Sequence, residues 1–241
     1  MSSRKKRRKK KSSSLLLTIC IIVIALLYRG GIIGNTYSTS MAEIPMVSYS
    51  KEDIPEYSGE KYVILNDNIP YFDDYTSEEF EIYGALDNLD RCTVAYANVS
   101  KYTMPTEKRE SIGSVRPSGW HISKYDFIDG KYLYNRCHLI GYQLTGENAN
   151  VKNLITCTRE MNTGIMLEYE NKVASYVKKT SNHVMYRVTP VFEEDNLVAK
   201  GAIMEGYSVE DSGVGIKFNI FVYNIQDGVI IDYSNGDNYP E

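Results

Sequence analysis

The chain has 241 residues, a formal net charge of −4 and 43% hydrophobic residues. The first forty or so residues differ in composition from the rest, and the remaining residues, about 200, are enough for one domain with a substantial core. Nine of the 27 Lys and Arg, and none of the 31 Asp and Glu, precede residue 43, so the remainder holds 18 against 31, a formal charge of −13. This balance argues against a module that coats nucleic acid by neutralising phosphates, but not against an enzyme with a locally positive cleft.

The N-terminal stretch predicts a membrane anchor. Residues 4–11 read RKKRRKKK, and the apolar run at 15–28 reaches membrane length if Arg29 lies at the interface and the span continues to residue 33. The basic flank favours a cytoplasmic N-terminus with the rest of the chain outside the cell. We expect a basic cytoplasmic head at 1–13, a transmembrane signal anchor at 14–34, a stalk at 35–60 and a folded domain at 61–241. Cleavage at the small residues 40–42, giving a secreted protein, is the alternative.

The folded domain is predicted to be α+β, an antiparallel sheet with few helices, because its C-terminal part alternates apolar and polar residues between turns. A long irregular segment covers residues 103–119, and loops of that length in a compact domain are usually functional or disordered. Strands are expected at 62–65, 93–97, 131–135, 153–156, 183–191, 197–204, 216–223 and 229–233, with a short polar helix at 77–87 and a longer helix at 161–178.

Three cysteines, Cys92, Cys137 and Cys157, lie in the folded domain. An odd number cannot pair completely within the chain, so one bridge with a free thiol and no bridge at all both remain open. CxxC and HxxxH spacings are absent from the sequence, which argues against a zinc site.

The run Asn135-Arg136-Cys137-His138, followed by Asn153 and Asn162, groups residues that phosphodiester chemistry requires. A neutral imidazole can accept a proton at physiological pH. An arginine fork suits a phosphate, and an amide oxygen suits a hard cation. A folded core has little use for all three together.

These residues sit in the segments NRCHLIGYQL, NLITCTREMN and LEYENKV, whose order resembles the DNA/RNA non-specific endonucleases of the ββα-metal superfamily. The resemblance is strongest to membrane-anchored DNA-entry nucleases and secreted streptococcal DNases, and it extends from residue 62 to the end of the printed chain. It implies a ββα-metal motif within the sheet fold. It also implies that His138 is the general base and that Asn162 binds a single divalent metal, Mg²⁺ or alternatively Mn²⁺.

Further roles follow from the same resemblance. Glu170 corresponds to a glutamate that orients water on the metal, Asn153 to an asparagine that supports the site, and Arg136 to the signature arginine. Arg159 and Arg116 are weaker candidates for binding substrate phosphate. Each also has a purely structural interpretation, such as a helix N-cap for Asn162 or a solvated helix face for Glu170.

Two positions depart from the DRGH signature of the family, Asn135 in place of aspartate and Cys137 in place of glycine. Cysteine restricts a backbone that glycine leaves free. Pairing of Cys137 with Cys92 or Cys157 would stiffen the catalytic loop, and we hold this as a hypothesis.

The sequence therefore predicts a signal-anchored extracellular endonuclease that hydrolyses DNA, and RNA as well, with little sequence preference and with 5′-phosphate products. Contacts to phosphate carry no base information, which explains the low specificity. A catalytically silent surface module that binds nucleic acid or a partner protein is the first alternative. A metal-dependent phosphatase is a weaker one.

Overall fold

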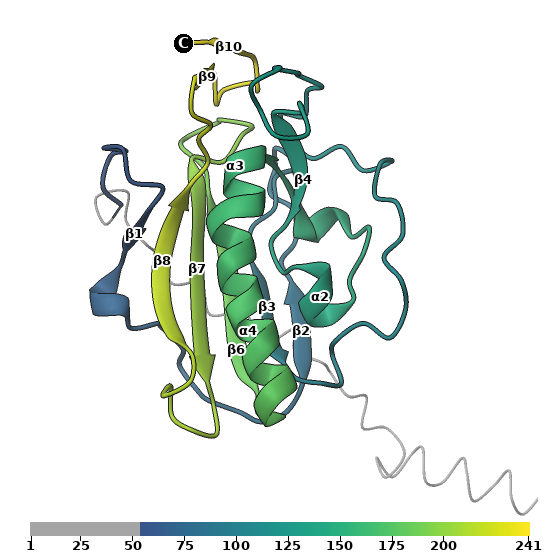
Figure 1. The fold of residues 1–241 in the computed structure, drawn as a ribbon, viewed down its shortest axis with the longest axis vertical. Coiled ribbons are helices and arrows are strands. Elements are labelled where there is room, and N and C mark those ends of the chain that lie inside the picture. The colour runs from purple at the N-terminus through teal and green to yellow at the C-terminus, as the bar shows by residue number, and fades with distance from the viewer. Residues whose placement is uncertain (1–53) are drawn as a thin grey trace, which may run out of the picture. The chain divides into compact units, whose positions relative to one another are not determined.

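The computed structural model describes residues 54–241, in which a six-stranded antiparallel sheet forms the centre (Figure 1). Every neighbouring pair in the order β1-β8-β7-β6-β3-β2 is antiparallel, which confirms the α+β expectation. The strands are β1 (Tyr62–Ile64), β2 (Phe80–Tyr83), β3 (Ala95–Val99), β6 (Val184–Val191), β7 (Gly201–Ser208) and β8 (Lys217–Tyr223).

A second, two-stranded sheet and a long helix are inserted between β3 and β6 and carry the sequence motifs. Figure 1 shows α4 lying across one face of the large sheet, with α2 and β4 beside it. The elements of this insertion are β4 (Tyr134–His138), α2 (Tyr142–Thr145), a 3-10 turn (Val151–Asn153), β5 (Leu154–Thr158), α3 (Arg159–Met161), a π-helical turn η4 (Asn162–Met166) and α4 (Leu167–Thr180). Outside it lie a 3-10 turn η2 (Asn66–Asn68) and a terminal ribbon of β9 (Val229–Ile231) and β10 (Asn238–Pro240).

The main hydrophobic core lies between α4 and the sheet. Val173 and Val177 of α4 are fully buried and belong to one cluster with Ala97, Val188 and Ile220 from three strands. Side chains of a strand alternate between faces, so these positions share the face that α4 covers. The core thus fixes the helix, and with it the site residues at the start of the helix.

The opposite face of the sheet carries a buried polar row. Arg187 and Glu205 are register partners on β6 and β7, and their side chains form an ion pair at 2.7 Å. The segment between η2 and β2 covers this pair: the Tyr71 amide donates to Glu205 at 2.7 Å, and Phe72 lies under the Arg187 guanidinium. Charge on this face is therefore neutralised within the chain.

Two expectations need correction. The polar helix predicted at 77–87 is wrong, because the chain there forms the edge strand β2, and Phe80 packs edge-on against Tyr96 of β3. An edge strand exposes polar residues much as a short surface helix does, so the composition was ambiguous. The strand predicted at 197–204 begins only at Gly201 and continues to Ser208.

Among residues 54–241, no helix combines the length and apolar character needed to cross a bilayer. The predicted head, the anchor at 14–34 and the stalk up to residue 53 lie outside the described residues. Within the last part of the predicted stalk, Ile54 is buried in a small cluster with Leu65 and Tyr223, and the Tyr223 hydroxyl donates to the Pro55 carbonyl. These stalk residues pack on the sheet.

Candidate active site

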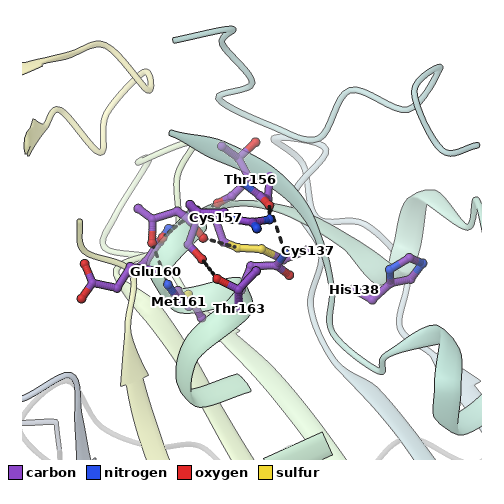
Figure 2. The surroundings of a disulfide bond; sticks show 12 residues. Cys137, His138, Thr156, Cys157, Glu160, Met161 and Thr163 are labelled. Carbon is purple, nitrogen blue, oxygen red and sulfur yellow. Dashed lines mark hydrogen bonds between the residues drawn. A yellow bond between two sulfur atoms is a disulfide. The ribbon is translucent and has the colours of Figure 1, made fainter. Parts of the chain in front are cut away.

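The hairpin of β4 and β5 supports the site. Its register runs from Tyr134 opposite Thr158 to His138 opposite Leu154, and its strands are joined by a disulfide between Cys137 and Cys157. Figure 2 shows this bridge near the start of α3, with the His138 side chain on the far side of β4 from it. The bridge was one of two pairings that the sequence left open.

Cys92 stays a free, buried thiol, and its sulfur donates to the carbonyls of Val151 and Leu154. Burial is the main cause that raises the pKa of this thiol to about 11. Cys92 therefore behaves as a core residue rather than as a nucleophile.

His138 ends β4 and is largely buried. Its Nε2 lies 2.7 Å from the Asn148 carbonyl, which can only accept, so Nε2 carries the proton and Nδ1 keeps the lone pair. The pKa of His138 is lowered to about 4, mainly because the ring is buried. The hydrogen bond to the Asn148 carbonyl opposes this shift, and the charge of Arg109 contributes to it. The imidazole is thus neutral at physiological pH and has one nitrogen able to accept a proton.

Asn153 holds the turn that follows His138. It is completely buried, its Oδ1 accepts from the Ile140 amide at 2.9 Å, and its Nδ2 donates to the Ile140 carbonyl at 3.0 Å. Its own carbonyl accepts from the Leu139 amide. Asn153 therefore fixes the backbone of the turn beside the histidine.

Glu170 projects from α4 into the same turn and is buried against Gly141. A Cβ on Gly141 would lie 2.2 Å from a Glu170 oxygen, so only glycine leaves room for the carboxyl group. Burial raises the pKa of Glu170 to about 8, opposed by a hydrogen bond from Gln143 and by the charge of Arg109. A cation arriving nearby would favour the ionised form.

Arg109 is the site residue that the sequence did not single out. Its Nη2 lies 3.4 Å from His138 Nδ1, its charge acts on Glu170, and it also lines the cleft described below. Arg109 belongs to the long irregular loop at 103–119, whose length signalled function, but it stands among Glu107, Lys108 and Glu110. Nothing in that run of charges distinguishes the residue that contacts the histidine.

Asn162 lies in the π-helical turn that begins after α3. Its Nδ2 donates at 3.1 Å to Asn135 Oδ1, which also accepts from Arg159 at 3.4 Å. Because an arginine can only donate, the shared atom of Asn135 must be oxygen, and the Asn162 atom facing it must be nitrogen. The Asn162 side-chain oxygen is therefore left to bind another group.

A cleft of about 540 Å³ is lined by Arg109, Asn135 and Asn162 among others. Arg109, Arg136 and Arg159 line it, and Asp129 is the single acidic residue in its lining within the described part of the chain. Asp129 pairs with Arg159 at 2.8 Å. Two buried donors in the lining, Arg159 Nε and Trp120 Nε1, have no hydrogen-bond partner among residues 54–241. The cleft thus offers positive charge and unused N–H groups to an anion.

Part of the Arg136 side chain is used to hold the loop at 113–120. Its Nε and Nη2 donate to the carbonyls of Val115 and Gly113, and its guanidinium stacks on Trp120 at 4.0 Å from the ring centre. Burial, followed by the charge of Arg116, lowers its pKa, so Arg116 is close although it does not line the cleft. Arg136 therefore faces the cleft while it also anchors the loop.

The structure brings Arg136, Arg159 and Asn162 together in the cleft. His138, Asn153 and Glu170 lie outside its lining, and Arg109 connects His138 with it. No group of three or more His, Cys, Asp or Glu that could hold a metal occurs among the described residues. One amide oxygen, with water and substrate oxygens completing the shell, nevertheless fits the hard-cation chemistry of Mg²⁺.

Comparison with known proteins identifies the class. The family model described as DNA/RNA non-specific endonuclease matches residues 72–210, more than half of the chain. The chain belongs to the DNA/RNA non-specific endonuclease family, and it is a nuclease.

Solved structures share its fold. NucA from Streptococcus agalactiae, with magnesium ion bound, is 24% identical with a TM-score of 0.65, covering 74% of this chain and 87% of NucA. The Sda1 nuclease, with bound zinc ion, is 28% identical with a TM-score of 0.57, covering 67% of this chain and 81% of Sda1. A protein described as an extracellular endonuclease is 21% identical with a TM-score of 0.56. The match covers 77% of this chain and 100% of that protein.

Proposed function

We propose that this protein is an extracellular endonuclease that cleaves DNA and RNA without sequence preference, using one divalent metal and His138 as general base. One observation carries the proposal: a neutral imidazole, held through Nε2 by the Asn148 carbonyl, presents its basic nitrogen beside an arginine of the cleft. A positioned base of this kind typically accelerates a reaction by about 10²–10⁴-fold.

His138 is proposed to remove the proton from the attacking water through Nδ1. Arg109 Nη2 faces Nδ1 at 3.4 Å and Arg109 also lines the cleft, so its charge would favour the neutral imidazole in the free enzyme. When substrate binds, Arg109 would turn to the substrate phosphate and leave Nδ1 open to the water. Glu170 would orient water close to the reacting phosphate. Asn153 holds the backbone that positions both groups.

Asn162 is proposed to bind the metal through its side-chain oxygen, which the hydrogen bond to Asn135 turns away from that residue. When bound, a divalent cation stabilises the negative charge that develops on the phosphate and on the leaving oxygen. Mg²⁺ is proposed as the physiological ion, with Mn²⁺ as a substitute. NucA with its magnesium ion and Sda1 with its zinc ion support a divalent metal in this fold.

The remaining arginines are proposed to hold the substrate. Arg159 and Arg136 both line the cleft, and the Arg159 Nε has no hydrogen-bond partner among residues 54–241, so both side chains can bind phosphate oxygens. Phosphate contacts do not read bases, which accounts for the absence of sequence preference. Arg116, close to Arg136, would add positive charge at the entrance.

The location outside the cell is proposed from the basic head and apolar run of the sequence and from the neighbours described as extracellular nucleases. An uncleaved signal anchor would leave the catalytic domain on the outer surface of the membrane. Cleavage of the anchor would release it, and fractionation of cells followed by intact-mass measurement separates the two.

The test is digestion of closed circular plasmid and of single-stranded RNA by the full chain in Mg²⁺, in Mn²⁺ and in EDTA. We expect cleavage with either metal and none in EDTA. Asn162→Ala should lose most activity and require more metal, whereas the matched control Asn88→Ala, at an exposed asparagine, should not change. Metal-independent binding without cleavage would instead support a silent surface module.

A further inference from the structure

A short hairpin at residues 123–133 forms one wall of the cleft and carries exposed apolar side chains that the proposed chemistry does not use. The Leu133 amide donates to the Ser123 carbonyl at 3.0 Å, the Tyr125 amide donates to the Lys131 carbonyl at 2.9 Å, and Lys124 and Tyr132 form a β-bridge. Lys124 and Tyr132 are therefore on one face of the hairpin, because opposite residues of an antiparallel pair share a face.

The other face of the hairpin is anchored. Leu133 is fully buried in a cluster that includes Tyr125 and two residues of β9, Val229 and Ile231. The Tyr125 hydroxyl donates to Asn238 of β10 at 2.8 Å. The hairpin is thus fixed to the terminal ribbon, so a ligand on its open face would meet a preorganised surface.

Tyr132 lies on the open face, and Ile122, just before the hairpin, lines the same cleft. Both line the cleft, yet 48% of Tyr132 and 68% of Ile122 is exposed. The one aromatic or cation contact of Tyr132 with another described residue is the Lys124 ammonium, 4.5 Å from the ring centre. Trp120, also in the lining, is already covered by Arg136. Tyr132 therefore keeps exposed ring surface in a positively charged cleft.

We propose that Tyr132 and Ile122 form a stacking subsite for an unpaired nucleobase next to the phosphate that is cut. The proposal rests on the proposed role of the cleft as the substrate site. Every base has an apolar face that stacks on an aromatic ring, and the arginines of the cleft and Lys124 would hold the adjoining phosphates. In a duplex the base faces are already stacked on their neighbours, so a single strand can use this subsite and an intact duplex cannot.

The consequence is a preference that does not depend on sequence. Stacking is tolerant of base identity, so the enzyme remains non-specific while it favours single-stranded DNA, single-stranded RNA and frayed ends. Truncating Tyr132 should weaken binding of a single strand by roughly 5- to 100-fold, the range that one base-to-aromatic stack supplies. Duplex binding, which depends on phosphate contacts, should change by less than about twofold.

The experiment uses the full chain with His138→Ala, so that binding is read without cleavage, and an oligonucleotide in which 2-aminopurine reports stacking by loss of fluorescence. We expect quenching with His138→Ala and with His138→Ala/Tyr132→Phe. His138→Ala/Tyr132→Ala should lose the quenching, and it should lose more affinity for a single strand than for a duplex of the same sequence. Tyr102→Ala in the same background is the matched control, since Tyr102 is 90% exposed and outside the cleft lining.

Unchanged quenching in the Tyr132→Ala protein, or an equal loss of affinity for single strand and duplex, would overturn the subsite. An unchanged melting temperature shows that the variant is folded. The same samples distinguish failure of the subsite from failure of the catalytic assignment. If His138 is not the base, His138→Ala will still cleave the oligonucleotide. The fluorescence reports stacking regardless of which residue acts as base.

Discussion

Two groups of arginines differ in what surrounds them. One arginine is buried and paired on the far face of the sheet, whereas three line the cleft, and the comparison shows which charges stabilise the fold and which are available to a ligand. On the far face of the sheet, Arg187 is 2% exposed, faces Glu205 and is covered by Phe72 and the Tyr71 backbone. Opposite charges are paired there, and the surrounding chain satisfies them. Such a pair has nothing left to offer a ligand.

In the cleft the arrangement is reversed. The cleft gathers three arginines, Arg109, Arg136 and Arg159, and Asp129 is the one acidic residue of the described lining. Arg159 also has a buried N–H without a partner in the described part of the chain. Gathering like charges costs stability unless an anion joins them. The same residue type therefore stabilises the fold in one place and, as we propose, binds substrate in the other.

The largest stability change should come from the far face. Arg187→Ala leaves Glu205 charged and buried, which typically costs about 3–5 kcal/mol. We expect urea unfolding to show that loss while the folded fraction retains its nuclease activity. Arg159→Ala, the matched variant in the cleft, should lose nuclease activity and keep its stability. If both variants lose activity without losing stability, the distinction between the two settings is wrong.

The disulfide below the cleft should contribute about 3 kcal/mol, since it closes a loop of 20 residues in the unfolded chain. The Cys137→Ser/Cys157→Ser double variant should lose that amount in chemical denaturation. The wild type in reductant should match it, and the double variant should not respond to reductant. Equal stability of all three samples would show that the bridge does not stabilise the fold.

The pH dependence of stability should distinguish the two buried or partly buried histidines by sign. Burial lowers the folded-state pKa of His138 to about 4, so its contribution is present above the ordinary value near 6.5 and is lost as pH falls through about 4. The loss is on the order of 3 kcal/mol. Compared with the wild type, His138→Gln should lose less stability between pH 7 and pH 4, a window defined by those two pKa values.

His183 is the control for this measurement. Burial alone would lower its pKa, but hydrogen bonds with Glu210 and Glu79 outweigh burial and raise it. Its contribution is therefore present below the ordinary value and is lost as pH rises through the raised value. His183→Gln should change the stability profile in the opposite sense from His138→Gln. Identical profiles for the two variants would contradict the buried, neutral state of His138.

The smallest effect should come from Asp129, whose carboxylate pairs with Arg159 at 2.8 Å where a phosphate would bind. The side chain of Asp129 is 85% exposed, so the pair is weak. Asp129→Asn should lower KM for DNA a few-fold at low salt, with the difference shrinking as salt screens the cleft. Lys131→Gln, at the cation that pairs with Asp126 on the same loop, is the control. A raised KM would show instead that Asp129 positions Arg159 productively.

Much of the candidate site could be predicted from the sequence because its residues are grouped in three short motifs. His138, Asn153 and Glu170 meet around one turn because the hairpin register and the helix bring nearby segments together. Arg109 could not be predicted, since its contact with His138 depends on the path of an irregular loop. The cysteine pairing could not be predicted either, because sequence spacing alone does not determine which two thiols lie close together in the fold.

The fold, too, could be predicted from the sequence only in part. Alternating strands in the C-terminal part were readable because one face is buried under α4. Strand β2 was mistaken for a helix because its partner, β3, supplies the contacts that define it. Local pattern was therefore sufficient where apolar and polar residues alternate along a strand, and insufficient where a distant strand decides the structure.

The most direct test of the account is chemical rescue of His138→Gly in the full chain, measured as nicking of closed circular plasmid in Mg²⁺. Removing the imidazole should reduce the rate by about 10²–10⁴-fold, and free imidazole should restore part of it in proportion to the neutral base present. Asn162→Ala should show no rescue. Full activity of His138→Gly without imidazole, or equal rescue of both variants, would contradict the assignment of His138 as the general base.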